Sequence, residues 1–282
     1  MTRRVQDTNG TWHAVGSIMP TPPDPSDPRG ETIPFHGRYR GAHNTGVPDK
    51  RALGLPEFAP QFTTPNVTYS DRHFIGYCEI NATGIVFERC YFEARNDLFG
   101  INANQITYFY DCDIYGGKYL DNSDAITGSV KAIRCHIWGG GNDNVGFGED
   151  GMYQDCYIHS VYQHYGTHSD NSQTLGNNNL GLIRNKLLSY DPYTGIQYNS
   201  SLQLATNGGN IDGVQIVDNY MDGGGYTING RALDPRFSNV LISGNRFGRH
   251  YAFGPVTAEV RVVPPYGTFT ATNVYDDTGV SV

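Results

Sequence analysis

The stretch FERCYF, residues 87–92, places a cysteine between two apolar positions, one three residues before it and one two residues after it. The same arrangement returns six times, with cysteine and later asparagine at the centre: FYDCDI 109–114, AIRCHI 132–137, YQDCYI 153–158, LIRNKL 182–187, IVDNYM 216–221 and ISGNRF 242–247. We call the seven central residues the anchors: Cys90, Cys112, Cys135, Cys156, Asn185, Asn219 and Asn245. An apolar residue on alternate positions is the pattern of a strand with one face inward.

Self-similarity at a period near 22 residues indicates a solenoid, in which each repeat forms one coil. A leucine-rich repeat has a similar period, but its L-x-x-L-x-L framework is missing. The pattern resembles that of a right-handed parallel β-helix, an all-β single-stranded solenoid, over residues 66–248. We expect seven or more coils, with the anchors in one ladder at a coil corner.

The composition is typical of strands and turns, and the net charge limits which partners the protein can bind. The chain of 282 residues has 35 glycines and 20 tyrosines and only 17% charged residues, which excludes a helical bundle. A formal charge of −8 argues against nucleic acid or an anionic membrane as partner. The first 20 residues lack the apolar core of a secretory signal, and no apolar run is long enough for membrane insertion.

The five cysteines are expected to be reduced and buried. Neighbouring coils would bring them close, but parallel Cβ vectors give poor disulfide geometry. Their spacing matches no C-x-x-C zinc pattern, so no metal site is predicted.

Four regions are predicted along the chain. Residues 1–30 contain a hairpin, RVQDTNGTWHAVGS, followed by a proline-rich linker. Residues 31–65 are irregular and should cap the first coil, because an open solenoid end exposes unpaired strand edges. The β-helix follows over residues 66–248, and residues 249–282 form a β-rich cap or association segment.

Aspartates recur after the anchor strands, at Asp97, Asp124, Asp143 and Asp170. If they align, their carboxylates require backbone hydrogen bonds, a cation or raised pKa values. One interpretation is a structural turn at each corner. The other is an acidic groove in which two carboxylates act as acid and base on a glycosidic bond.

The insertion HSVYQHYGTHSDNSQ, residues 159–173, is a second candidate for chemistry, although histidine beside tyrosine in a turn also serves structural hydrogen bonding. The candidate catalytic residues are Asp124, Asp143, Glu149, His164, His168 and Asp170. Flat polar-tipped rings suit stacking on sugars, so the candidate binding residues are Tyr162, Tyr165, Tyr190, Tyr193 and Tyr198, with Arg184 as the basic residue. We expect Asp143, Glu149, His164, His168, Asp170 and Tyr193 to form one cluster.

Known β-helix enzymes give a test of catalysis. Pectin-hydrolysing glycosidases of this fold carry N-T-D, D-D, G-H-G and R-x-K, and only Asn122-Ser123-Asp124 is similar to the first. WGGGNDNV, residues 138–145, resembles one calcium-binding nonapeptide repeat, a motif that binds in tandem. No cofactor is therefore expected, and a structural or bridging Ca²⁺ is the alternative left open.

A β-helix behind a proline-linked N-terminal module resembles the tail spikes and minor tail proteins of bacteriophages. The N-terminal hairpin and the ending NVYDDTGVSV, residues 273–282, are similar to segments of such proteins from phages of actinobacteria. The resemblance implies a homotrimer in the virion tail that contacts other tail proteins through its N-terminal region and a host cell-surface glycan through the β-helix.

Three functions remain open at this point: a receptor-binding tail component that recognises a polysaccharide without cutting it, a polysaccharide depolymerase (hydrolase or lyase), and a bacterial enzyme on the same scaffold.

Overall fold

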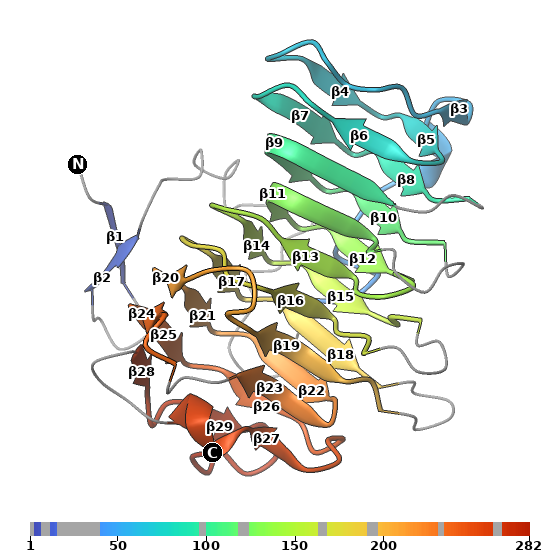
Figure 1. Cartoon of the computed structure of the whole chain (residues 1–282). Coiled ribbons are helices and arrows are strands. Elements are labelled where there is room, and N and C mark those ends of the chain that lie inside the picture. Colours follow the sequence, from blue (N-terminus) through green and yellow to red (C-terminus); the bar gives the residue numbers. More distant parts are fainter. Residues whose placement is uncertain are drawn as a thin grey trace.

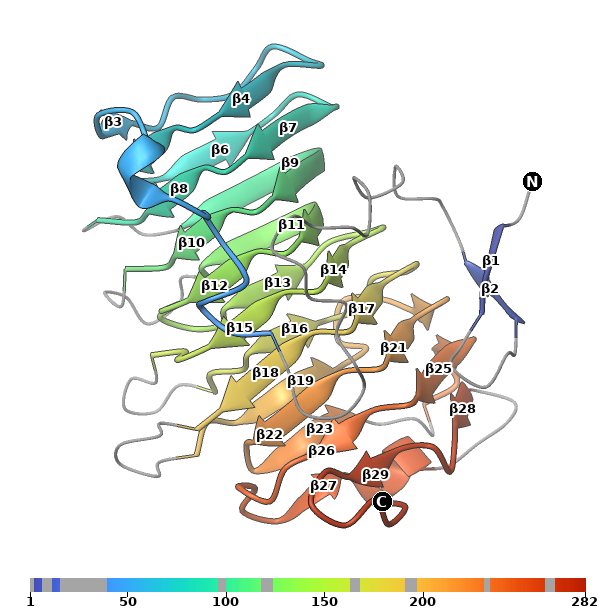
Figure 2. The ribbon, with the colours of Figure 1, turned by 180° about the vertical axis from the view of Figure 1, so that it is seen from behind.

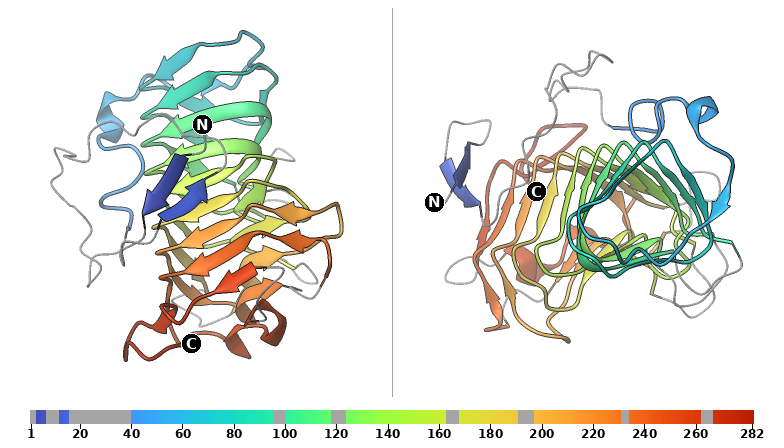
Figure 3. Two further views of the ribbon diagram at one scale, coloured as in Figure 1. Left: turned by 90° about the vertical axis from the view of Figure 1, so that its left-hand side faces the viewer. Right: turned by 90° about the horizontal axis from the view of Figure 1, so that it is seen from above.

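The computed structural model describes residues 3–6, 12–15, 40–95, 100–117, 124–162, 168–190, 197–230, 234–261 and 267–282. Near the N-terminus, β1 (Arg3–Gln6) pairs antiparallel with β2 (Trp12–Val15). From residue 40 onward the described strands pair almost entirely in parallel and stack coil upon coil, as Figures 1 and 3 show. The predicted right-handed parallel β-helix is thus confirmed.

One wall of the solenoid contains the strands that follow the anchors and the strands that continue the same sheet at both ends, and we call it the post-anchor sheet. Its ten strands among the described residues are β3 (Glu57–Phe58), β5 (His73–Ile75), β8 (Tyr91–Glu93), β10 (Asp113–Tyr115), β12 (His136–Trp138), β15 (Tyr157–His159), β18 (Lys186–Ser189), β22 (Tyr220–Gly223), β26 (Arg246–Phe247) and β29 (Val274–Tyr275). Neighbouring strands come from successive coils, so residues at equal distance from the anchor lie side by side.

The other large sheet forms two further walls, which meet along the long strands β9 (Ile101–Tyr110) and β11 (Ile126–Ile133). The wall before the anchors contains β4 (Thr68–Ser70), β7 (Ile85–Glu88), β14 (Met152–Gln154), β17 (Gly181–Ile183), β21 (Gln215–Val217), β25 (Val240–Ser243) and β28 (Gly267–Phe269). The third wall contains β6 (Cys78–Ile80), β13 (Val145–Phe147), β16 (Ser172–Thr174), β19 (Ser200–Leu204), β23 (Tyr226–Gly230) and β27 (Gly254–Val256).

Smaller elements complete the described chain: η1 (Lys50–Ala52), η2 (Ala258–Arg261), and the pair β20 (Ile211–Asp212) and β24 (Phe237–Ser238), which lies in the longer later coils. No helix in the described residues is long and apolar enough to cross a membrane.

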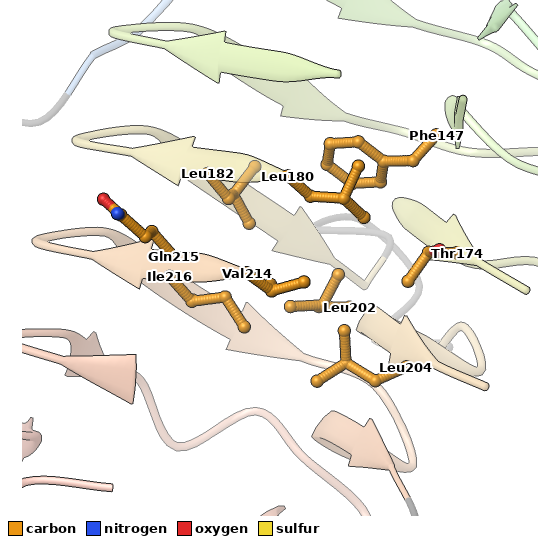
Figure 4. A pocket seen from close by; sticks show the side chains of 9 residues that line it. All are labelled: Phe147, Thr174, Leu180, Leu182, Leu202, Leu204, Val214, Gln215 and Ile216. Atoms are coloured by element: carbon orange, nitrogen blue, oxygen red, sulfur yellow. The ribbon is translucent and has the colours of Figure 1, made fainter. Parts of the chain in front are cut away.

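The core is the column of side chains enclosed by the walls. All fourteen apolar positions that flank the anchors are buried, as the alternation predicted. In the first coils the column is aromatic, with Phe87 and Phe109 stacked at 5.1 Å between ring centroids. Later coils use smaller side chains and leave a small apolar cavity, lined by Phe147, Thr174, Leu180, Leu182, Leu202, Leu204, Val214 and Ile216, with Gln215 at its edge (Figure 4).

The anchors form the predicted ladder. The cysteines are free thiols and buried, and the Cys90 N–H lies 3.4 Å from Cys112 Sγ. Each asparagine amide oxygen accepts the backbone N–H of the preceding coil, at 2.8 Å for Asn185 to Asn219 and 3.0 Å for Asn219 to Asn245. Asn273 continues the ladder, accepting the N–H of Asn245 at 3.1 Å. The coils therefore extend past the predicted boundary at 248.

Replacing Asn219 by alanine should lower the free energy of unfolding by roughly 1 to 3 kcal/mol, because the buried Asn185 N–H would lose its acceptor. Asn104→Ala, at an exposed amide bonded to Asn81, is the matched control. Urea unfolding of both variants measures the difference. Equal midpoints would contradict a stabilising role for the ladder.

Candidate functional site

The outward side of the post-anchor sheet carries two rows of side chains, because the positions one and three after each anchor point away from the core. The first row reads His73, Tyr91, Asp113, His136, Tyr157, Lys186, Tyr220 and Arg246, in register across neighbouring strands. The second row reads Glu93, Tyr115, Trp138, His159, Leu188 and Asp222. We call both rows together the outer strip; its strands follow one another in Figure 2.

The middle of the outer strip is a run of stacked rings. His136 lies 4.2 Å from Trp138 and Tyr157 lies 4.1 Å from His159, measured between ring centroids. His136 and His159 stack across the two strands at 5.0 Å. These four side chains are half-buried, so their packed rings form a firm surface that still reaches solvent. Such rings combine an apolar face with a polar edge, which suits a sugar ring.

A chain of polar contacts runs along the same strands. Asp113 Oδ1 lies 3.3 Å from His136 Nδ1, and His136 Nε2 lies 2.7 Å from His159 Nε2. His159 Nδ1 in turn lies 2.6 Å from Ser160 Oγ. A neutral imidazole has one donor and one acceptor nitrogen, so one consistent direction is Ser160 to His159 to His136 to Asp113. This chain can take up or release a proton at the surface.

Residues 40–50, which precede the first coil, complete this part of the site. They cross the wall corner beside β15, β12 and β10 (Figure 2) and place Lys50 Nζ 2.7 Å from Asp113 Oδ2. Gly46 has φ of 76° and donates its N–H to the Arg134 carbonyl at 2.8 Å. A Cβ there would lie 2.9 Å from His136 Cβ and closer still to Asp113 Oδ1, so this close approach requires glycine.

The lower part of the outer strip is centred on Lys186. Its Nζ lies 5.5 Å from the ring of Tyr157 and 5.9 Å from the ring of Tyr220, the neighbours in register on β15 and β22. Asp222 Oδ2 lies 2.7 Å from His250 Nδ1, and Tyr190 stacks on His250 at 4.4 Å. Tyr190, a predicted binding residue, therefore lies at this end of the strip.

Burial perturbs the titration of these groups. It lowers the pKa of Lys186 and raises the pKa of Tyr157 to about 12. Burial and then the charge of Asp222 raise the pKa of Tyr220. Both phenols consequently keep their protons at neutral pH, and the hydroxyl of Tyr220 donates to Asp222 Oδ2 at 3.2 Å.

Asp124, Asp143 and Asp170 form one line, as predicted, and we call them the acidic row. Asp124 Oδ1 accepts the N–H of Asp143 at 3.2 Å, and Asp143 Oδ1 accepts the N–H of Asp170 at 2.7 Å. Asp170 accepts from the hydroxyl of Ser200 and, at 2.9 Å, from the amide of Asn199. Each carboxyl group thus bonds to the next coil, and Asp170 also accepts a long contact from Gln173 of its own coil, at 3.5 Å.

Burial is the largest cause that raises the pKa of each acid, to about 6 for Asp124, about 9 for Asp143 and about 7 for Asp170. For Asp143 the charges of its two neighbours add to the effect. Because Asp143 and Asp170 are only 1% and 0% exposed, the expected open acidic groove is not present at these two residues. Their contacts indicate a structural role, although the bonds join successive coils instead of closing a turn at each corner. Asp97 lies outside the described residues.

The other predicted site residues do not form the expected cluster. Glu149 is exposed at the opposite end of β13 from Asp143 and accepts the Asn178 N–H at 3.0 Å, so the prediction that it joins Asp143 and Asp170 is wrong. His168 is exposed near Asp170. His164, Tyr165 and Tyr193 lie outside the described residues.

The remaining predicted binding residues are scattered. Tyr162 is 43% exposed and donates its backbone N–H to the Gly140 carbonyl, whereas Tyr198 is buried. Arg184 occupies a wall corner with φ of 53° and pairs with Asp155 at 2.9 Å. In the described ranges no group of three or more His, Cys, Asp or Glu side chains is arranged to hold a metal ion.

Sequence reasoning missed most of the outer strip, although the signal was present. The alternation that identified the inward residue two positions after each anchor also marks its two neighbours as outward. Comparing the residues one and three positions after each anchor would have identified Tyr157, His159 and Lys186 as outward.

Comparison with known proteins supports the fold. No family model matches the sequence, and no curated protein matches it. Among solved structures the chain is similar to the A-module of the mannuronan C-5 epimerase AlgE4 from Azotobacter vinelandii, with a TM-score of 0.55 and 14% identity. The match covers 76% of this chain and 60% of that one. At this identity the likeness establishes a shared β-helix architecture and nothing further.

Proposed function

We propose that the protein binds a polysaccharide on the outer strip of the post-anchor sheet. The observation that carries this proposal is the run of in-register half-buried rings from His136 and Trp138 to Tyr157 and His159. A solenoid repeats its surface chemistry along its axis, which suits a polymer with a repeating unit. The similarity to an enzyme named for a polysaccharide, mannuronan, supports the same class of ligand.

The finer proposal is a receptor-binding component of a phage tail that acts at the bacterial surface. It rests on the resemblance of the N-terminal and C-terminal segments and on the missing signatures of pectin hydrolases. In this proposal the N-terminal region attaches to other tail proteins and the outer strip recognises a host cell-surface glycan.

Cleavage of the polysaccharide is the second candidate, and the chain from Asp113 through His136 to His159 favours it. A hydrolase of the common type needs two carboxyl groups that reach the sugar. Asp143 and Asp170 are buried, so the histidines fit better with a lyase, in which a base removes a proton from the sugar.

One experiment separates the two candidates. The protein is incubated with polysaccharide from actinobacterial cell walls, and retained binding is measured together with new reducing or unsaturated ends. Binding without new ends supports the receptor function. New unsaturated ends that are lost in His159→Ala support the lyase, and failure to bind contradicts the proposed function.

Tyr157→Ala should weaken glycan binding by roughly 1 to 3 kcal/mol, by analogy with aromatic stacking on other planar ligands. This loss of binding free energy corresponds to a rise in Kd of about 5- to 150-fold. Tyr108→Ala, on the outward side of the wall before the anchors, removes a similar ring from another wall and should leave Kd unchanged. Affinity electrophoresis in cell-wall polysaccharide provides the comparison. A larger loss in the control would place the binding surface on the other wall.

The assembly proposed from the tail-spike resemblance is a homotrimer. Light scattering at micromolar concentration should give three times the mass of the 31.1 kDa chain. A stable monomer would refute this assembly.

A further inference from the structure

The outer strip carries both signs of charge, and its acidic groups already have partners. Glu93 contacts His73 at 3.0 Å and Arg95 at 2.9 Å. Asp113 contacts Lys50 and His136, and Asp222 contacts His250. Each of these carboxylates thus has a partner within the protein.

Lys186 differs from the other cations of the strip. Lys50 is paired with Asp113, and Arg246 is paired with Asp276 at 2.5 Å. Within the part of the chain that the structure describes, no carboxylate lies within ion-pair distance of Lys186 Nζ, which contacts the faces of Tyr157 and Tyr220, and Asp222 acts on it only through its charge. Lys186 is half-buried, and burial lowers its pKa although the charge of Asp222 acts in the opposite direction.

The surroundings of Lys186 restrict which ligand groups can reach its ammonium. Both neighbours in the first row are tyrosines in register, so a ligand group that reaches Nζ lies between two phenol rings. Tyr157 keeps its hydroxyl proton at neutral pH and is available as a donor. An anion accepts hydrogen bonds from an ammonium and from a phenol and forms the stronger, charge-assisted bond, whereas a neutral sugar hydroxyl accepts without adding a negative charge.

We propose that Lys186, between Tyr157 and Tyr220, is a subsite for an anionic substituent, a carboxylate or a phosphate, on the polysaccharide that the outer strip binds. This inference rests on the proposed function and specifies its ligand: an acidic glycan rather than a neutral one. The protein as a whole is acidic, with a formal charge of −8, so general electrostatic attraction does not account for such binding and a local cation is required.

Affinity electrophoresis of the whole chain tests the subsite. The gels contain polygalacturonate, the same polymer with its carboxyl groups reduced to alcohols, or poly(glycerol phosphate). We expect retention of the parent to be at least tenfold stronger with one of the anionic polymers than with the reduced polymer. The anionic polymer that retains the protein distinguishes carboxylate from phosphate.

Two variants test whether Lys186 causes the preference for the anionic polymer. Lys186→Met keeps the length and the apolar stem of the side chain and should abolish the preference for the anionic polymer. Arg51→Gln also removes one positive charge, from an exposed side chain outside the strip, and should retain the preference. Circular dichroism confirms that both variants are folded.

Each remaining outcome overturns the inference. Equal retention by the anionic and reduced polymers, retention by the reduced polymer alone, or no retention by any gel means that the strip has no anion subsite. A preference that survives Lys186→Met means that the anion binds elsewhere. The proposed function is judged separately by binding to cell-wall polysaccharide and by Tyr157→Ala, so it can stand when the anion subsite fails.

Discussion

Replacing Ile137 by aspartate is expected to prevent stable folding. Ile137 is fully buried on β12, in register with Ile114 and Ile158 of the neighbouring coils. A carboxylate at this position would lie inside the apolar column without a partner, which costs several kcal/mol. Because each coil is stabilised by its neighbours, the defect also weakens the coils on both sides.

Thermal unfolding and the yield of soluble protein measure this effect. Val86→Asp is the matched control, since it introduces the same charge at an outward, half-buried position of β7. The control should fold with a melting temperature within a few degrees of the parent. Unchanged melting of Ile137→Asp would contradict the placement of the residues that follow the anchors.

The sequence predicted the coils well because the alternation around the anchors reports burial directly. Ile137 and its equivalents could be assigned to the interior without knowing how the coils stack, since the strand period alone puts them on one face. Asn273 was missed for a physical reason. Phe269, the inward residue paired with Ile242, stands four residues before Asn273 instead of three, so the last coil breaks the spacing.

The site was harder to predict because it depends on contacts between distant segments. Lys50 reaches Asp113 only because the segment around Gly46 passes close to His136, and no repeat pattern encodes that path. The alignment of the acidic row was predictable from its recurrence, but its burial was not. Burial of Asp143 and Asp170 depends on the following coils, which supply the hydrogen-bond donors: the Asp170 N–H for Asp143 and the Ser200 hydroxyl for Asp170.

The acidic row should make the protein less stable as the pH rises. Burial and the charges of Asp124 and Asp170 raise the pKa of Asp143 to about 9, whereas an aspartate in the unfolded chain ionises near pH 4. Between these values the folded state binds more protons than the unfolded state, so the free energy of unfolding falls with increasing pH. Below about pH 4 the carboxyl group is protonated in both states and this effect vanishes.

Asp143→Asn is therefore expected to stabilise the protein at high pH. An amide keeps the acceptor for the Asp170 N–H but carries no charge, so the variant should gain little at pH 4.5 and several kcal/mol at pH 9. Subtracting the parent's free energy of unfolding at each pH removes the contribution of other titrating groups. Glu149→Gln, which removes an exposed carboxylate of the same coil, is the matched control. Urea unfolding at pH 4.5, 7 and 9 measures the difference, and a gain that is constant with pH would mean that Asp143 does not hold its proton in the folded protein.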